Sequence, residues 1–582
     1  MYKKTYEFIS KQTNDPILER RKCKISWEDF AIFQSDIDFY DKISPTFNGK
    51  KYQIPRPTLC PEERMRRRLL FKNERALFRN KCDLTEKSII STHAPDSGFK
   101  VYNVKSWRSD DRDAIDYQRE YDLWRSFFDQ YKDLYFDVPQ IAMMNDHAIK
   151  SENIEYCQNV AYSKNCYLTT VARKLEHTYY SSNMAWWNWL IDCFFTMESE
   201  NCYECCDSNH LYWCFWLQYS YDCQSCWFGY DLSGCQDCIA CVNLRNKKYC
   251  IFNKQYTQQE YETQKDNLLK HLNKDPEKIK KKFYDFVATQ VHRATYNTNA
   301  TNTYSSNLYN AENAIMCYNV QNIKDSKYCV FWDTMEDAMD LTVGWELNLC
   351  YEWNVPDHSY KACFTVFCRS CTNIYYSEMC HNCQDCFACV WLRNKQYCIL
   401  NKQYTKEEYG QKVAEIVEKM QSDWERGEFF PSDLAPYPYN ISTVMDYFPL
   451  NKKEATEKWY KRREKIEEIN VPEDITLIEA KDLWYSSSDI SDEILQKGVV
   501  CQESGRPFRI LKPELDFYKK WNIPFPHKHP DIRFEERLQR MPPKELNIRK
   551  CDKTQKEVLS VYWQDVSFSV YSQEAYKQEF YS

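Results

Sequence analysis

The sequence predicts a mainly β protein: two narrow β-solenoids in tandem, each with twelve residues per coil, joined by helical connectors and flanked by related α+β modules at both ends. Three observations predict this fold class. Every third residue is small or apolar through residues 151–250 and again through 299–398, cysteines recur at intervals of twelve, and the two ends of the chain carry matching phrases.

The first observation is a strict period of three. Residues 151–250 hold 17 Asp, Glu, Lys and Arg, of which only Lys247 falls on the phase that starts at Ser151. Residues 299–398 also hold 17, and only Lys395 falls on the phase that starts at Asn299. An α-helix turns about 100° per residue and a strand alternates its faces, so neither keeps such a stripe over this length. We therefore expect a chain that winds in small coils and points each third side chain inward.

The cysteine spacing gives the length of a coil. Twelve residues per coil, with four inward positions, predict about eight coils in each stretch, and 12 of the 29 cysteines are inward in the first stretch and 10 in the second. The pattern resembles, in architecture, the 12-residue β-solenoids of beetle antifreeze proteins, although it lacks their flat Thr-x-Thr ladder. The cysteines that mark the repeat most clearly are Cys202, Cys214, Cys226, Cys238 and Cys250.

One outward column of the first stretch is aromatic. We expect it to pack against the other solenoid or a flanking helix, because large exposed apolar patches are rare on monomers. The alternative is an exposed surface that stacks on sugars or on a protein partner. As a candidate interaction surface the column consists of Tyr167, Tyr179, Tyr203, Phe215 and Trp227.

The ends of the chain, residues 1–106 and 498–582, match one another. Cys23-x-x-Ser26 corresponds to Cys501-x-x-Ser504 at an offset of 478, whereas Cys82 corresponds to Cys551 at an offset of 469. The N-terminal copy therefore carries a nine-residue insertion between Tyr40 and Ile54.

Several phrases point to a family. Residues 60–69, 71–75, 81–85, 392–397 and 505–510 resemble an uncharacterised Cys-rich repeat family of ultra-small, candidate-phyla bacteria. The resemblance implies zinc-ribbon-like modules at the ends of Cys-rich repeats and carries no established activity.

This chain departs from that family at the metal ligands. Its end modules keep only the first cysteine of most Cys-x-x-Cys pairs and neither cysteine of the closing pair, at Asn103-x-x-Ser106 and Ser572-x-x-Ala575. A structural zinc site needs four ligands. We therefore expect degenerate zinc-ribbon-like modules that fold without zinc, and no metal or cofactor. The candidate ligands that remain are Cys23, Cys60, Cys82, Cys501, His529 and Cys551.

Residues 64–81 are strongly basic. A basic helix of this kind could contact RNA phosphates. We favour a solvated helix whose charges pair with Glu62, Glu63 and Glu74. The candidate phosphate contacts are Arg64, Arg66, Arg67, Arg68 and Arg75.

The remaining segments connect these parts. Residues 107–150 form a helical connector with a helix near 117–124, and capping boxes at Thr257-x-x-Glu260 and Thr405-x-x-Glu408 start a helix after each solenoid. The similar phrases 244–256 and 392–404 cap the solenoid ends, with a binding site as the alternative. The expected divisions are 1–106, 107–150, 151–252, 253–297, 298–400, 401–497 and 498–582.

The sequence excludes several function classes. It contains no nucleotide-binding loop, no hydrolase elbow and no His-Glu-x-x-His motif, so we expect no enzyme. The net charge of −7, the apolar-poor start and the absence of a long apolar run predict a cytoplasmic protein with reduced thiols and no membrane contact.

The leading hypothesis is a non-enzymatic scaffold that binds a protein partner or self-associates. Three alternatives stay open. They are an RNA- or ribosome-associated factor, a metal or redox protein using zinc or an iron–sulfur cluster, and a carbohydrate binder that uses the aromatic column.

Overall fold

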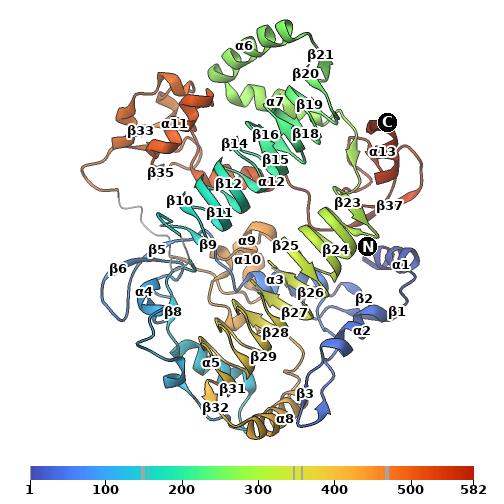
Figure 1. Cartoon of the computed structure of the whole chain (residues 1–582), viewed down its shortest axis with the longest axis vertical. Helices are drawn as coiled ribbons and strands as arrows, with labels where there is room; N and C mark the ends of the chain where they lie inside the picture. Colours follow the sequence, from blue (N-terminus) through green and yellow to red (C-terminus); the bar gives the residue numbers. More distant parts are fainter. Residues whose placement is uncertain are drawn as a thin grey trace.

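The computed structural model describes residues 2–145, 151–154, 156–344, 348–355, 358–465 and 471–581. Strands account for 34% of the protein and helices for 27%, which confirms the expected mainly β class. Two arrays of short strands lie one beyond the other along the molecule, and helices and small sheets cover their sides (Figure 1). None of the described helices is long and apolar enough to cross a membrane.

The first array contains 13 strands. Neighbouring strands run parallel and pair each residue with the one twelve positions later, as Cys238 pairs with Cys250. Only the last strand, β21, is antiparallel. The strands are β9 (Gln158–Ala161), β10 (Lys164–Tyr167), β11 (Thr170–Tyr179), β12 (Ser182–Ile191), β13 (Phe194–Met197), β14 (Cys202–Tyr203), β15 (Cys206–Tyr212), β16 (Phe215–Gln218), β17 (Tyr221–Gln224), β18 (Trp227–Tyr230), β19 (Gln236–Val242), β20 (Lys248–Ile251) and β21 (Lys254–Gln255).

The second array contains ten strands with the same parallel pairing at twelve, except at its start and at its last strand, β32, which is antiparallel. At the start Thr298 pairs with Tyr309, only eleven positions later. The strands are β23 (Thr298–Thr301), β24 (Tyr304–Lys327), β25 (Val330–Glu336), β26 (Ala338–Thr342), β27 (Cys350–Asn354), β28 (Tyr360–Val366), β29 (Thr372–Tyr375), β30 (Gln384–Phe387), β31 (Gln396–Ile399) and β32 (Lys402–Gln403).

The short first repeat corrects the predicted frame of the second array. Asn299 and Asn302 are exposed, not inward, and the buried phase begins with Ser305 and Leu308. One residue fewer in the first repeat shifts the frame, so a phase counted from Asn299 is wrong at its first two positions.

The backbone of both arrays repeats every third residue. Two extended residues are followed by one in the left-handed region, with φ between 45° and 65°, from Asn153 to Phe252 and, among the described residues, from Asn307 to Leu400. Asn and Asp tolerate this conformation better than other residues with a Cβ. Such residues also bond along the array, where Asn310 donates to Asn322 at 3.1 Å and Asn313 to Asp325 at 2.7 Å.

Small polar side chains form hydrogen bonds with the backbone inside the arrays. Ser220 Oγ donates to the carbonyl of Gln218 at 3.0 Å and accepts the N–H of Leu232 at 3.2 Å. Cys205 Sγ donates to the carbonyl of Cys214 at 3.3 Å. Buried backbone groups need partners, so these inward Ser and Cys side chains supply hydrogen bonds as well as small volume.

The end modules lie beside the arrays. The N-terminal module (1–106) borders the second array, and the C-terminal module (498–582) borders the first (Figure 1). The N-terminal elements are α1 (Tyr2–Thr13), β1 (Ile17–Lys22), β2 (Asp29–Phe33), α2 (Gln34–Ile43), β3 (Thr46–Phe47), β4 (Lys50–Lys51), α3 (Pro61–Leu69), β5 (Phe78–Lys81), β6 (Ser88–Ser91), β7 (Val101–Tyr102) and α4 (Val104–Trp107). The C-terminal elements, with the strand β33 that pairs to them, are β33 (Thr476–Glu479), β34 (Lys497–Val500), β35 (Pro507–Phe508), α11 (Lys512–Trp521), α12 (Pro530–Gln539), β36 (Asn547–Lys550), β37 (Glu557–Ser560), β38 (Val570–Tyr571) and α13 (Gln573–Phe580).

The connectors differ from the sequence prediction in one place. The helix expected near 117–124 lies instead at Phe127–Asp137, where Ser126 caps its start. Both predicted capping boxes are confirmed, at Thr257 and Thr405. The connecting elements are α5 (Phe127–Asp137), β8 (Gln140–Ile141), α6 (Gln258–Lys274), α7 (Pro276–Val287), β22 (His292–Arg293), α8 (Lys406–Ser422), α9 (Val444–Tyr447) and α10 (Lys452–Glu457).

The two lysines on the inward phase lie at the ends of the arrays. Lys247 is exposed, and Lys395 forms an ion pair with Asp113 of the connector at 2.6 Å. Neither charge is therefore enclosed in an interior of thiols and aliphatic side chains, where an unpaired ammonium would be costly.

Candidate functional site

The helix α3 fixes the N-terminal module to the second array through two buried arginines. Arg64 reaches Asp340 at 3.0 Å and Arg68 reaches the other oxygen of the same carboxylate at 3.3 Å. All three side chains are at most 2% exposed. The guanidinium of Arg64 also lies over the ring of Tyr328, whose hydroxyl donates to Asp36 at 3.4 Å. We call this group the second clasp.

The helix α12 fixes the C-terminal module to the first array in the same way. Arg533 and Arg537 both bind Asp192, and the Arg537–Asp192 distance is 2.9 Å. Arg533 lies over the ring of Tyr180, whose hydroxyl donates to Glu514 at 3.1 Å. We call this group the first clasp.

The two clasps correspond residue by residue. The repeat of 148 relates the array residues Asp192 and Tyr180 to Asp340 and Tyr328. The module offset of 469 relates Arg64 and Arg68 to Arg533 and Arg537. The offset of 478 relates Asp36 to Glu514. Each module therefore docks on an array through the same contacts, and it docks on the array farther from it in the sequence.

The candidate phosphate contacts lie in internal ion pairs. Besides Arg64 and Arg68, Arg67 bridges Glu352 and Glu428 at 2.9 Å each. Arg66 pairs with Glu63, and Arg75 pairs with Asp531 of the C-terminal module. The basic segment is thus not the solvated helix that the sequence suggested. Two of its partners, Asp340 and Glu352, come from the second array. The sequence pattern could not indicate this, because it does not show which face of the helix is covered.

The aromatic column faces the interior of the molecule. Tyr167 pairs in register with Tyr179, and Tyr203 with Phe215 and then Trp227. All except the half-buried Tyr167 are buried. The helix α11 covers the middle of the column, where Tyr518 packs on Tyr203 with ring centroids 5.6 Å apart and Trp521 on Phe215 at 6.2 Å.

The module cysteines lie in four small polar clusters. Cys60 is 3.6 Å from the hydroxyl of Ser26, and a hydrogen bond from the Cys60 thiol lowers the pKa of Cys23 to about 4. Cys82 accepts from the amide of Asn103 at 3.2 Å. Although burial raises its pKa, hydrogen bonds from Thr85 and Asn103 outweigh that effect and lower it to about 7.

The C-terminal module repeats this arrangement. Cys501 accepts from the N–H of Ser504 at 3.4 Å, and Cys551 from that of Ser572 at 3.2 Å. His529 caps α12 by accepting the N–H of Asp531, and burial lowers its pKa to about 4. Among the described residues no three His, Cys, Asp or Glu side chains are grouped so that they could hold a metal ion.

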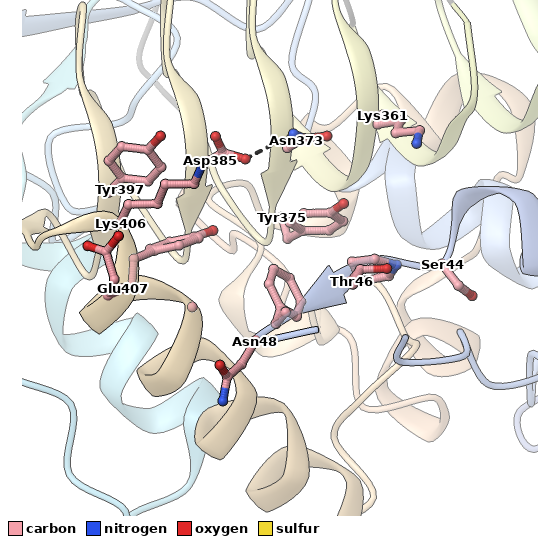
Figure 2. Close-up of a pocket in the computed structure, with 14 residues that line it drawn as sticks. Ser44, Thr46, Asn48, Lys361, Asn373, Tyr375, Asp385, Tyr397, Lys406 and Glu407 are labelled. Carbon is pink, nitrogen blue, oxygen red and sulfur yellow. Dashed lines mark hydrogen bonds between the residues drawn. The ribbon is translucent and has the colours of Figure 1, made fainter. Parts of the chain in front are cut away.

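A pocket of about 460 Å³ lies between the β3–β4 hairpin, the second array and the start of α8. The sequence pattern does not indicate this pocket, although the hairpin lies in the stretch between Tyr40 and Ile54 that carries the nine-residue insertion. Figure 2 shows one wall as a row of side chains on successive strands, Lys361, Asn373, Asp385 and Tyr397, with Thr46, Asn48, Lys406 and Glu407 opposite.

The residues of that row are related by the twelve-residue repeat. All four have left-handed backbone conformations, with φ from 50° to 57°. Asn373 donates to Asp385 at 2.9 Å. The wall therefore presents one polar or charged group per strand.

The pocket also has an aromatic floor. Phe47 of the hairpin packs edge-on against Tyr375, with ring centroids 5.7 Å apart, and against Tyr409 at 6.4 Å. Tyr397 lies 5.9 Å from Tyr409. The Tyr409 hydroxyl is buried and, within the described part of the chain, has no hydrogen-bond partner, and burial raises its pKa well above the usual range.

The corresponding place in the first array is built differently. The C-terminal module lacks the insertion, and its Trp521 packs on Trp213, the residue that corresponds to Lys361, with ring centroids 5.4 Å apart. In the first array, an aromatic contact therefore occupies the place that is an open pocket wall in the second array. Compared with known protein families and with curated proteins, the sequence matches none.

Proposed function

We propose that the protein is a non-enzymatic binding scaffold, built from two 12-residue β-solenoids that are each clasped by a degenerate zinc-ribbon-like module. The parallel pairing at twelve and the buried third residues support the solenoid assignment. Metal is not required for the modules, because side-chain and backbone hydrogen bonds surround each cysteine in place of further ligands.

The correspondence of the two clasps is the observation that carries this proposal. The arginines that could bind phosphate are buried against Asp192 and Asp340, so their charges hold the molecule together. Neutralised charges release no counterions, which removes the main source of affinity for RNA. The proposed ligand of the scaffold is a protein partner or a second copy of this chain. The proposed location is the reducing cytoplasm.

Two measurements test the scaffold against the RNA-associated factor. The first titrates the purified chain with a fluorescent single-stranded RNA at low and at physiological salt. We expect weak binding at both, and tight binding that falls steeply with salt would overturn the proposal. The second cross-links the chain in native lysate with and without ribonuclease. A scaffold keeps its cross-linked proteins after ribonuclease, whereas an RNA-associated factor loses them.

A further inference from the structure

We infer that the pocket beneath the β3–β4 hairpin binds a neutral oligosaccharide. Its volume of about 460 Å³ is within the usual range for ligand sites, roughly 300 to 1,000 Å³. The site differs from the aromatic column that the sequence suggested for sugars, since that column is covered by α11. The inference does not depend on which protein the scaffold binds.

The charges that line the pocket are balanced. Lys361 and Lys406 carry two positive charges, and Asp385 and Glu407 carry two negative ones. A phosphate or a metal cation would need a net field of one sign, which this lining does not supply. A neutral ligand with many hydroxyl groups can instead donate to the carboxylates and accept from the ammonium and carboxamide groups.

The geometry of the pocket also fits a sugar chain. Neighbouring strands lie about 4.8 Å apart, so the row Lys361, Asn373, Asp385 and Tyr397 offers hydrogen-bonding groups at a regular step comparable with one hexopyranose unit. At the floor of the pocket, the rings of Phe47, Tyr375 and Tyr409 provide apolar surface. Pyranose rings have the matching character, with C–H groups on their faces and hydroxyls on their edges.

Tyr409 adds an independent observation. Its side chain is only 4% exposed, lines the pocket and has a hydroxyl that no described residue satisfies. Buried hydroxyls usually have a hydrogen-bond partner. The hydroxyls of Tyr131 and Tyr351 also have none among the described residues, so the feature that singles out Tyr409 is its place in the pocket lining, where a ligand hydroxyl is a candidate partner.

The test uses three neutral probes, cellohexaose, chitohexaose and maltohexaose, with the full-length protein. Saturation-transfer NMR detects contact, and calorimetry measures affinity. We expect at least one probe to bind with a Kd of roughly 10 μM to 1 mM. The affinity should be the same at low and high salt, because the ligand is uncharged.

Variants matched by the 148-residue repeat separate the site from general effects. Tyr409→Phe and Asp385→Asn should each weaken binding about tenfold, the size expected when a polar partner is lost. Tyr261→Phe and Asp237→Asn, at the equivalent positions of the first array, should leave binding unchanged. Thermal melts of all four should show that the pocket variants remain folded.

Two outcomes would overturn the inference. The first is that no probe binds at about 1 mM. The second is that a probe binds but both pocket variants retain its full affinity, whatever the controls show. Binding of a charged peptide that displaces the sugar and depends on salt would assign the pocket to a protein ligand instead. None of these outcomes bears on the clasps, which are tested separately by stability.

Discussion

At the scale of single residues, the arrays hold carboxylates where water does not reach. Glu378 is 2% exposed, and the hydroxyl of the buried Tyr135 donates a hydrogen bond to it at 3.1 Å. Burial raises the pKa of Glu378 to about 8. The folded protein therefore holds this proton more tightly than the unfolded chain, in which the pKa is about 4.5.

This difference predicts a pH-dependent stability. As pH rises from about 4.5 to 8, the unfolded chain ionises first, so the contribution of Glu378 to stability falls and then stays low above pH 8. Glu378→Gln should remove the decline and exceed wild type at about pH 9 by a few kcal/mol, since one pKa unit is about 1.4 kcal/mol. Urea unfolding at several pH values in this range measures the free energy of unfolding. Glu312→Gln, at an exposed position, is the control. Parallel profiles for wild type and Glu378→Gln would contradict the prediction.

At the scale of the coil, the sequence predicted the repeat but not the backbone that makes it. The period of three and the cysteine spacing showed which residues are inward, and the structure agrees for Cys226, Cys238 and Cys250, all buried. The left-handed residue before each inward one was not predicted, because Tyr, Trp and Lys occupy many of those positions. The Asn and Asp residues on that phase, such as Asn310 and Asn322, were the signal.

The coil interior makes one serine a sensitive test. Ser220→Ala removes the acceptor for the N–H of Leu232 and should cost about 1 to 3 kcal/mol. Ser220→Arg should prevent folding, because an unpaired charge has neither room nor partner there. Denaturant titration and circular dichroism distinguish the two. A well-folded Ser220→Arg variant would show that the position is not enclosed.

At the scale of the whole molecule, the sequence did not indicate which module docks on which array. Both modules carry the same pair of arginines and both arrays carry the same aspartate, so either pairing satisfies the local chemistry. The structure pairs Arg64 with Asp340 and Arg533 with Asp192. The pocket could not be predicted from the sequence either, because an insertion does not show which surface it packs against.

Each module docks on the array farther from it in the sequence, so a mutation in one array should loosen the module from the opposite end of the chain. Asp192→Asn leaves Arg533 and Arg537 buried without their carboxylate and should cost about 3 to 5 kcal/mol, and Asp340→Asn should cost a similar amount. Hydrogen exchange should rise in α12 for the first variant and in α3 for the second. Faster exchange of α3 in Asp192→Asn would mean that the modules dock differently.

The crossed docking also sets an order of events during synthesis. The first array is complete at residue 255, but α11, which covers Phe215, begins at residue 512. At about 5 to 20 residues per second, a ribosome needs tens of seconds to make the segment between them. During that interval the part of the aromatic column around Tyr203 and Phe215 lacks the cover that α11 later provides. A nascent chain stalled before the C-terminal module should therefore bind chaperones or aggregate, whereas the second array meets a module that was made first.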